Sequence, residues 1–211
     1  MYVLHYYPGN ASLFPHMLLR ELGVPFELKR VDRENNEQKS PAYLKLNPTG
    51  HIPLLVHDGR PIYETVAIAL YLADRHPEAK MAPGVMDPQR GDFLKWLMLF
   101  TNDLQMQYRA WFYPHEFVSD EAHIESSKAA TAQRLGKTFA MIGEHLDRNT
   151  YLLGDAISAA DLYLFMMTRW GRAMPNPPRN IRSLARHAER IAARPEAQET
   201  LRTEGLDAPY V

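Results

Sequence analysis

The chain has 211 residues, of which 45% are hydrophobic, and it carries a formal net charge of −1. This composition predicts a packed globular protein of one large domain or two small ones, and the near-neutral charge argues against nucleic acid or anionic lipid as a partner. Because cysteine is absent, disulfides, thiolate metal sites and a sulfur nucleophile of the protein's own are excluded.

The first part of the chain predicts a strand, a turn and a helix. Residues 2–7 form a strand-like run that ends at a Pro-Gly pair, and the apolar spacing after Ser12 predicts a helix that ends at Gly23. Residues 26–31 predict a second strand. Since parallel strands are joined through right-handed crossovers, we expect these two strands to lie side by side in one sheet.

A hairpin and a further helix follow. Residues 53–63 are consistent with two short strands around Asp58-Gly59, a dipeptide that favours a two-residue turn. The apolar spacing over residues 64–76 then predicts a helix. The resulting order, βαβ-ββα, predicts a compact α/β domain over residues 1–78.

The two ends of the hairpin have the features of a small-ligand site. Ile52-Pro53 is a candidate cis peptide, which would turn the backbone N–H and C=O of Ile52 outward instead of into a strand ladder. Those groups can pair with an extended peptide in antiparallel fashion. At the start of the next helix, Glu64 favours an amine, and the helix N-terminus at Thr65 favours a carboxylate.

The remainder of the chain predicts helices. Residues 79–88 contain Pro and Gly that break the pattern, and we expect a linker there. The segments 89–113 and 120–147 are amphipathic with a helical period, and no later segment predicts a convincing strand. The sequence therefore predicts an all-helical domain over residues 89–211.

One further helix start is visible between residues 152 and 162. Ser158 and Asp161 have the Ser-x-x-Asp spacing of a capping box, and Ile157 and Leu162 are placed to form a hydrophobic staple around it. We interpret Asp161 as a structural residue, because capping residues stabilise proteins by about 0.5–2 kcal/mol.

The combination of Ile52-Pro53 with Glu64-Thr65 resembles the glutathione site of the cytosolic glutathione transferases. In that family the residue before a cis-proline binds the cysteinyl backbone, and an acidic residue followed by Ser or Thr binds the γ-glutamyl end. The resemblance implies a thioredoxin-like N-terminal domain and a helical C-terminal domain, and the capping box at Ser158 and Asp161 looks like the one in the transferase C-terminal domain. It also implies a homodimer, and glutathione as co-substrate without a metal. The pattern after Tyr6 looks like bacterial Beta-type sequences, except that Ala11 replaces their cysteine.

Such an enzyme must hold the glutathione sulfur as a thiolate, although the pKa of a free thiol is about 8.5. Lowering the pKa by two units requires about 2.7 kcal/mol. One hydrogen bond to a charged acceptor contributes about 1.5–3 kcal/mol, and a helix N-terminus about 0.3–1 kcal/mol. A single hydroxyl on the first helical turn can therefore be sufficient.

Three residues compete for this role. Ser12 stands where serine-type transferases carry their activating hydroxyl, and its Oγ or backbone N–H could point at the sulfur. Asn10 can donate an amide N–H, and Tyr6 stands where tyrosine-type classes carry their phenol. Each also has an ordinary structural interpretation: Ser12 as a helix cap, Asn10 as a turn former and Tyr6 as a core residue.

The resemblance also implies contacts outside the thiol. His51 and Lys39 are candidates to contact the glycyl carboxylate of glutathione, and Asp103 could reach the glutathione of a partner subunit. Beside the sulfur we expect an apolar pocket for a hydrophobic electrophile. Its candidate residues are Asn102, Gln105, Met106, Arg109 and Tyr113.

Our first hypothesis is a glutathione transferase that conjugates the thiolate to a hydrophobic electrophile. A second is glutathione-dependent reduction of disulfides or peroxides, and a third is a non-catalytic interaction protein that keeps the fold. Glu64 and Thr65 argue against the third. The N-terminus lacks a basic flank and a long apolar core, and no later run has membrane-spanning length, so we expect a cytoplasmic protein without a membrane partner.

Overall fold

The computed structural model describes residues 1–211, which form two compact units. One unit comprises Met1–Asp87 and Ala193–Tyr210, and the other comprises Pro88–Ala192 with Val211. The first break lies within the predicted linker. The predicted helical domain extended to residue 211, but the segment Ala193–Tyr210 packs with the N-terminal unit instead. Local periodicity locates a helix along the chain but does not say which unit it joins.

The first unit contains a four-stranded mixed sheet in the order β2-β1-β3-β4. Strand β1 is parallel to β2 and antiparallel to β3, and β3 is antiparallel to β4. The bounds are β1 Tyr2–Tyr6, β2 Phe26–Arg30, β3 Leu54–His57 and β4 Arg60–Tyr63. This sheet, with a helix in the crossover between its parallel strands, confirms the predicted thioredoxin-like fold.

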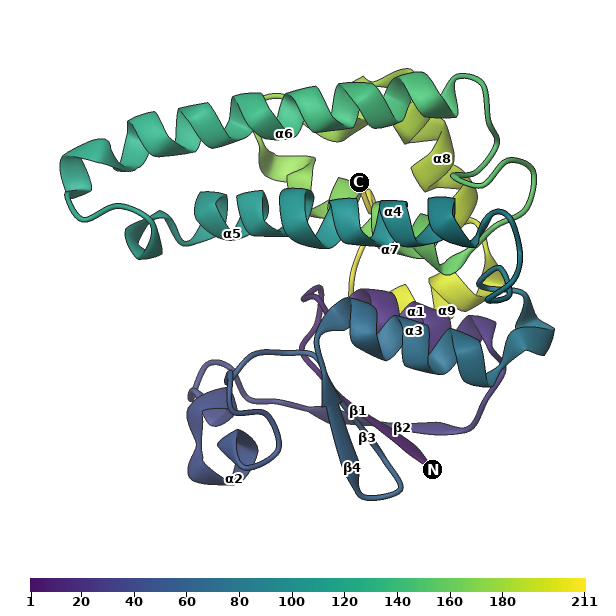
Figure 1. Cartoon of the computed structure of the whole chain (residues 1–211). Helices are drawn as coiled ribbons and strands as arrows, with labels where there is room; N and C mark the ends of the chain where they lie inside the picture. Colours follow the sequence, from purple (N-terminus) through teal and green to yellow (C-terminus); the bar gives the residue numbers. More distant parts are fainter. The chain divides into compact units, whose positions relative to one another are not determined.

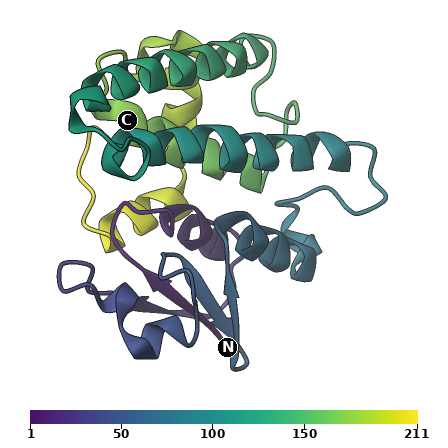
Figure 2. The ribbon, with the colours of Figure 1, turned by 60° about the vertical axis from the view of Figure 1, so that its left-hand side comes forward.

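Helices cover this sheet because they present apolar side chains to it. Helices α1 (Leu13–Glu21) and α3 (Thr65–Arg75) lie side by side on one face, whereas the short α2 (Pro41–Leu44) lies away from them (Figures 1 and 2). The last helix, α9 (Pro195–Thr203), lies over α1 in both views. The fully buried side chains of this core include Leu4, Phe14, Met17, Leu54, Ile68 and Leu72.

The hairpin turn has the predicted geometry. His57 pairs with Arg60, so that Asp58 and Gly59 form a two-residue loop. Both loop residues have positive φ, 50° for Asp58 and 77° for Gly59. This is the backbone that the Asp-Gly dipeptide favours, because Gly tolerates positive φ without steric cost and Asp tolerates it better than most residues.

The second unit is helical, as predicted. A long run consists of α4 (Arg90–Leu99), a π-helical segment (Phe100–Gln105) and α5 (Met106–Phe112), and α6 (Ile124–Leu146) lies alongside it (Figure 1). The sequence predicted one uninterrupted helix over 89–113. A π turn adds one residue to a helical turn, which the apolar periodicity does not reveal. No helix of the chain has the length and apolar character to cross a membrane.

The capping box of the second unit is present. The remaining helices are α7 (Ala159–Trp170) and α8 (Arg182–Ala192). Asp161 is fully buried, and its carboxylate accepts hydrogen bonds from the backbone N–H groups of Ser158 and Leu152, each at 2.9 Å. His187 Nε2 of α8 lies 3.0 Å from the same carboxylate. Asp161 therefore joins the start of α7 to α8 and to the preceding loop, which agrees with the structural role predicted for it.

Candidate functional site

The strand register brings the two predicted ligand segments to the same end of the hairpin. Leu54 is opposite Tyr63 in the β3–β4 pair. Residues 52–53 therefore precede β3 at the place where residues 64–65 follow β4. The Ile52–Pro53 peptide is cis, as predicted. Because the ladder of β3 begins at Leu54, the backbone groups of Ile52 lie outside it.

The residue before Ile52 is held by two side chains that the sequence did not single out. The His51 carbonyl accepts hydrogen bonds from the Tyr43 hydroxyl and from Asn47 Nδ2, each at 2.8 Å. Burial raises the pKa of Tyr43 to about 12, so its hydroxyl keeps its proton and remains a donor at neutral pH. Asn47 is also buried. These contacts fix the path of the chain into Ile52.

The structure brings Lys39 next to the turn that carries His51. Gly50 has φ +63°, and a Cβ there would lie 2.8 Å from Lys39 Nζ and 3.0 Å from the Gln38 carbonyl oxygen. Only glycine fits this backbone without displacing its neighbours. Lys39 Nζ donates to the Thr49 carbonyl at 3.4 Å, and both Lys39 and His51 are exposed. The two candidates for contact with a carboxylate thus lie close together.

Glu64 and Thr65 open α3 as predicted. Thr65 is buried at the first position of the helix, while Glu64 is exposed and its side chain does not cap the helix. Glu64 has φ 74° and ψ 119°, an unusual backbone for a residue with a side chain. Such a conformation costs about 1–3 kcal/mol and is found preferentially at functional sites.

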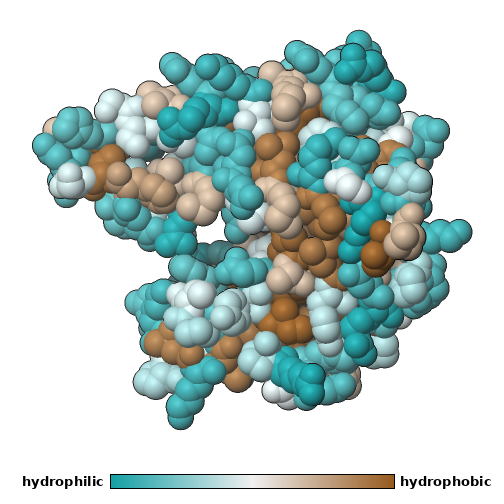
Figure 3. Space-filling model, viewed as in Figure 1, coloured by the Kyte–Doolittle hydropathy of each residue, from teal (hydrophilic) through white to brown (hydrophobic).

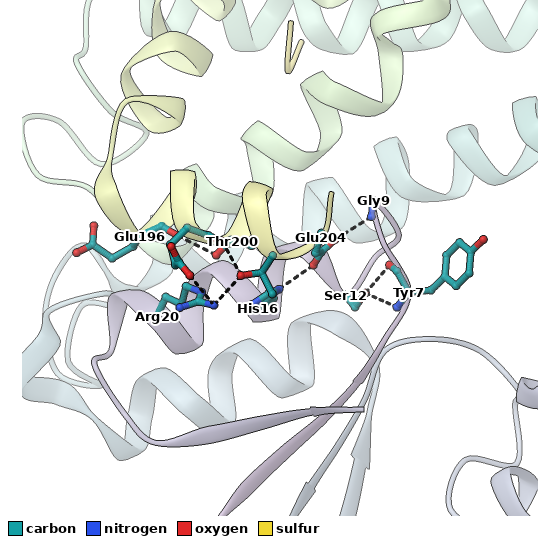
Figure 4. A network of polar contacts seen from close by, with 10 residues as sticks. Tyr7, Gly9, Ser12, His16, Arg20, Glu196, Thr200 and Glu204 are labelled. Carbon is teal, nitrogen blue, oxygen red and sulfur yellow. Dashed lines mark hydrogen bonds and ion pairs between the residues drawn. The ribbon is translucent and has the colours of Figure 1, made fainter. Parts of the chain in front are cut away.

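The third candidate segment, the turn 7–12, begins at the same end of the sheet, because His5 of β1 is opposite Leu54. Within this turn the Ser12 side chain is fully buried. Its Oγ donates to the Tyr7 carbonyl at 3.1 Å and accepts the Tyr7 N–H at 3.2 Å (Figure 4). The hydroxyl proton of Ser12 is therefore engaged by the turn, and its side chain does not cap α1 as its structural interpretation expected. A role of Ser12 in activating the thiol stays a prediction.

Asn10 and Tyr6 occupy less enclosed positions. Asn10 is half-buried, and its Oδ1 accepts the Ala11 N–H at 2.7 Å. This bond orients the amide and leaves its Nδ2 group as a donor. Tyr6 is half-buried at the end of β1, with its ring edge-on to His16 at 6.1 Å between centroids.

In the helical unit, the predicted pocket residues fall into two groups. Asp103 and Gln105 of the π-helical segment are engaged inside the unit: Asp103 accepts from Gln107 Nε2 and Thr138 Oγ1, each at 2.6 Å, and Gln105 Oε1 accepts from the Tyr163 hydroxyl. These bonds tie the segment to α6 and α7. In this structure the carboxylate of Asp103 therefore has partners within its own unit, which the sequence did not predict.

The other pocket candidates lie at the surface of the unit. Asn102, Met106 and Tyr113 are exposed. Arg109 forms an ion pair with Glu116, with Nη2–Oε2 at 2.7 Å and Nε–Oε2 at 2.8 Å, a contact that sequence reasoning missed. Apolar surface is visible around the α5 end of this unit (Figure 3), and its exposed side chains are Met106, Phe112, Tyr113 and Phe117.

Comparison with known proteins decides the family. Residues 1–74 match the model of the glutathione S-transferase N-terminal domain, and residues 101–195 match that of the C-terminal domain. The chain belongs to the glutathione S-transferase family. A curated relative, glutathione S-transferase GST-4.5 of Xanthomonas campestris pv. campestris, is 31% identical over 95% of this chain and 97% of its own length.

Solved structures of transferases agree. The glutathione S-transferase from Xylella fastidiosa superposes with a TM-score of 0.90 at 29% identity, over 98% of this chain and all of its own (100%). A sphingomonad glutathione S-transferase complexed with glutathione gives 0.85 at 31% identity, over 97% and 100%. The predicted family, fold and glutathione co-substrate are therefore confirmed, and the chain is a transferase enzyme of this kind. The Beta-like, serine-type assignment stays a prediction.

Sequence reasoning missed one further contact of the turn 7–12, which we call the thiol turn because it carries candidates for activation of the thiol. Glu204, just after α9, accepts the Gly9 N–H at 2.8 Å. It also lies 2.8 Å from His16 Nδ1, and both side chains of this pair are fully buried. Residues this far apart in the sequence give no local signal, so only the folded unit could reveal the contact.

Proposed function

We propose that glutathione lies across the end of the sheet where residues 52–53, 64–65 and 7–12 meet. The cysteinyl backbone pairs with Ile52, and the γ-glutamyl end meets Glu64 and the N-terminus of α3 at Thr65. The observation that carries this proposal is the strand register, which brings segments distant in sequence to one end of one sheet. The exposed Glu64 at its unusual backbone angles adds support.

We propose that Asn10, together with the N-terminus of α1, lowers the pKa of the bound thiol. The Asn10 amide is oriented through Oδ1 by the Ala11 N–H, so Nδ2 can donate to the sulfur. A donor to a charged acceptor contributes about 1.5–3 kcal/mol, which is close to the 2.7 kcal/mol needed for two pKa units. Ser12 contributes through its backbone N–H and by holding Tyr7, and Tyr6 is the alternative donor.

The thiolate then attacks a hydrophobic electrophile. Sulfur forms a bond to the electrophilic carbon, the leaving group departs with its electron pair, and the product is a thioether. The electrophile pocket expected around Met106 and Tyr113, which are exposed on the helical unit, stays a prediction. The homodimer and the cytoplasmic location expected from the resemblance stay predictions.

The test is a pH titration of thiolate absorbance for glutathione mixed with stoichiometric protein, compared with free glutathione. We expect the midpoint to fall about two units below the free value of about 8.5. Mass analysis of the products formed with a model aryl halide and, in a separate reaction, with a model peroxide then separates conjugation from reduction, because the halide gives a thioether whereas reduction of the peroxide oxidises two glutathiones to glutathione disulfide. An unshifted titration would contradict thiol activation, and glutathione disulfide as the main product would favour the reductase.

A further inference from the structure

The buried carboxylate of Glu204 links the end of the chain to the thiol turn. Its Oε2 accepts the Gly9 N–H at 2.8 Å, and its Oε1 lies 2.8 Å from His16 Nδ1 (Figure 4). The side chains of Glu204 and His16 are both 0% exposed. A carboxylate without solvent is tolerated only with such partners, so its position is tightly determined.

The turn is therefore held from two sides. Ser12 Oγ, from the residue before α1, holds it at Tyr7, and Glu204, from the residue after α9, holds it at Gly9. Asn10 is the next residue after Gly9, and its own N–H donates to the Tyr7 carbonyl at 3.1 Å. Gly9 has φ +68°, a left-handed backbone that favours glycine, and a Cβ there would be in ordinary van der Waals contact with Leu206 Cδ2 at 3.5 Å.

We propose that Glu204 and His16 are positioning residues for thiol activation: the C-terminal helix sets the place from which the turn donates to the sulfur. This inference rests on the proposed function, in which the turn carries the donor. A hydrogen-bond donor must be held within about 0.5 Å of its productive geometry to be effective, and a free Pro-Gly turn does not provide that restraint.

A second carboxylate between the same two helices provides a matched control. Glu21, at the end of α1, accepts from Arg194, the residue before α9, with Oε1–Nε at 2.5 Å and Oε2–Nη2 at 2.6 Å. The Glu21 side chain is 5% exposed. Glu21 and Glu204 thus both join α1 to the C-terminal segment, but only Glu204 contacts the thiol turn. Loss of helix attachment alone should act alike at both sites.

The experiment compares Glu204→Leu, Glu204→Gln and Glu21→Gln. For each folded variant, the thiol pKa of bound glutathione, the Kd for glutathione and the Tm are measured. We expect Glu204→Leu to raise the thiol pKa by about one unit, a roughly tenfold loss of thiolate well below the midpoint, with less than a threefold change in Kd. Glu204→Gln keeps an oxygen for the Gly9 N–H and should retain most of the activation. Glu21→Gln should lower Tm without moving the thiol pKa.

The sign of the change separates positioning from charge. If Glu204 acted only through its negative charge, removing that charge would lower the thiol pKa, since a nearby anion disfavours a thiolate. A lowered or unmoved pKa in Glu204→Leu would therefore overturn the proposal, as would an equal rise in Glu21→Gln. Failure of the proposed function has a different signature, because wild-type protein would then show no shift relative to free glutathione.

His16→Phe keeps the test decisive if Glu204→Leu does not fold. A phenyl ring preserves the edge-on packing of His16 against Phe26, at 5.7 Å between centroids, but removes the nitrogen that Glu204 contacts. We expect the thiol pKa to rise with little change in Kd. An unmoved thiol pKa in folded His16→Phe would contradict the proposed role of the pair.

Discussion

The hairpin end and the thiol turn lie at the same end of one sheet but depend on different parts of the chain. The contacts that fix the hairpin end come from nearby sequence, since Tyr43 and Asn47 hold the carbonyl of His51. The turn is held in part by Glu204, which is 195 residues from Gly9. We infer that ligand binding depends on a locally encoded element, whereas thiol activation depends on a long-range contact.

This difference predicts that binding and activation can be separated by mutation. Variants at the hairpin end should change the Kd for glutathione, and variants around the turn should change the thiol pKa. A variant in the helical unit supplies the baseline, because it should change stability alone.

The largest effect is expected for Asp161→Ala in the helical unit. The substitution leaves two buried N–H groups and His187 without their carboxylate partner, and each buried polar group left without a hydrogen-bond partner costs about 1–3 kcal/mol. We expect a corresponding loss in the free energy of unfolding, measured by denaturant titration. The Kd for glutathione in the folded fraction should be unchanged. Asp155→Ala, at an exposed position before the same helix, is the control. Wild-type stability in Asp161→Ala would contradict the structural role.

Glu64→Gln tests the hairpin end. Loss of the charge that meets the amine of the γ-glutamyl group should raise the Kd for glutathione at least tenfold, equivalent to about 1.4 kcal/mol. The thiol pKa at saturating glutathione should stay within experimental error of wild type. Isothermal titration calorimetry measures the first quantity, and Glu78→Gln at an exposed site of the same unit is the control. If the Kd does not change, the proposed γ-glutamyl contact is incorrect.

Asn10→Asp tests the turn. Aspartate keeps the oxygen that accepts the Ala11 N–H but replaces the donor group with a negative charge. The thiol pKa of bound glutathione should rise by one unit or more, with a smaller rise for Asn10→Ala, because only aspartate adds repulsion. Asn36→Asp, on an exposed residue of the same unit, should leave the titration unchanged. Equal titrations for Asn10→Asp and wild type would transfer the role to the Ser12 N–H or to Tyr6.

The smallest expected effect is a loss of unfolding free energy at acidic pH, caused by His5. Burial is the main cause that lowers the pKa of His5 to about 4, Lys29 lowers it further, and Glu37 opposes the shift. In the unfolded chain His5 should titrate near 6.5, so its contribution to stability is complete above that pH and is lost as the pH falls toward 4. Between pH 7 and pH 6, wild type should lose about 0.7 kcal/mol more unfolding free energy than His5→Phe. His5 faces Tyr43 edge-on, so this loss concerns the hairpin end. Parallel losses in both proteins would show that His5 is not responsible.

Much of this protein follows from its sequence because the relevant physics is local. The Asp58-Gly59 turn, the start of α3 after Glu64 and the capping box at Ser158 and Asp161 depend on residues a few positions apart. Steric preferences and short-range hydrogen bonds decide such elements before the chain is compact. The family resemblance in the hairpin was recognisable for the same reason.

Only the tertiary structure decided which side chains complete these elements. The Ser12 hydroxyl contacts Tyr7, and the Asp103 carboxylate contacts Thr138, and the sequence predicted neither partner. The segment that contains Glu204 joins the first unit instead of the helical one. A buried polar group takes whichever partner the packed core brings within about 3 Å, and that choice is made by contacts across the whole chain, which local sequence patterns do not encode.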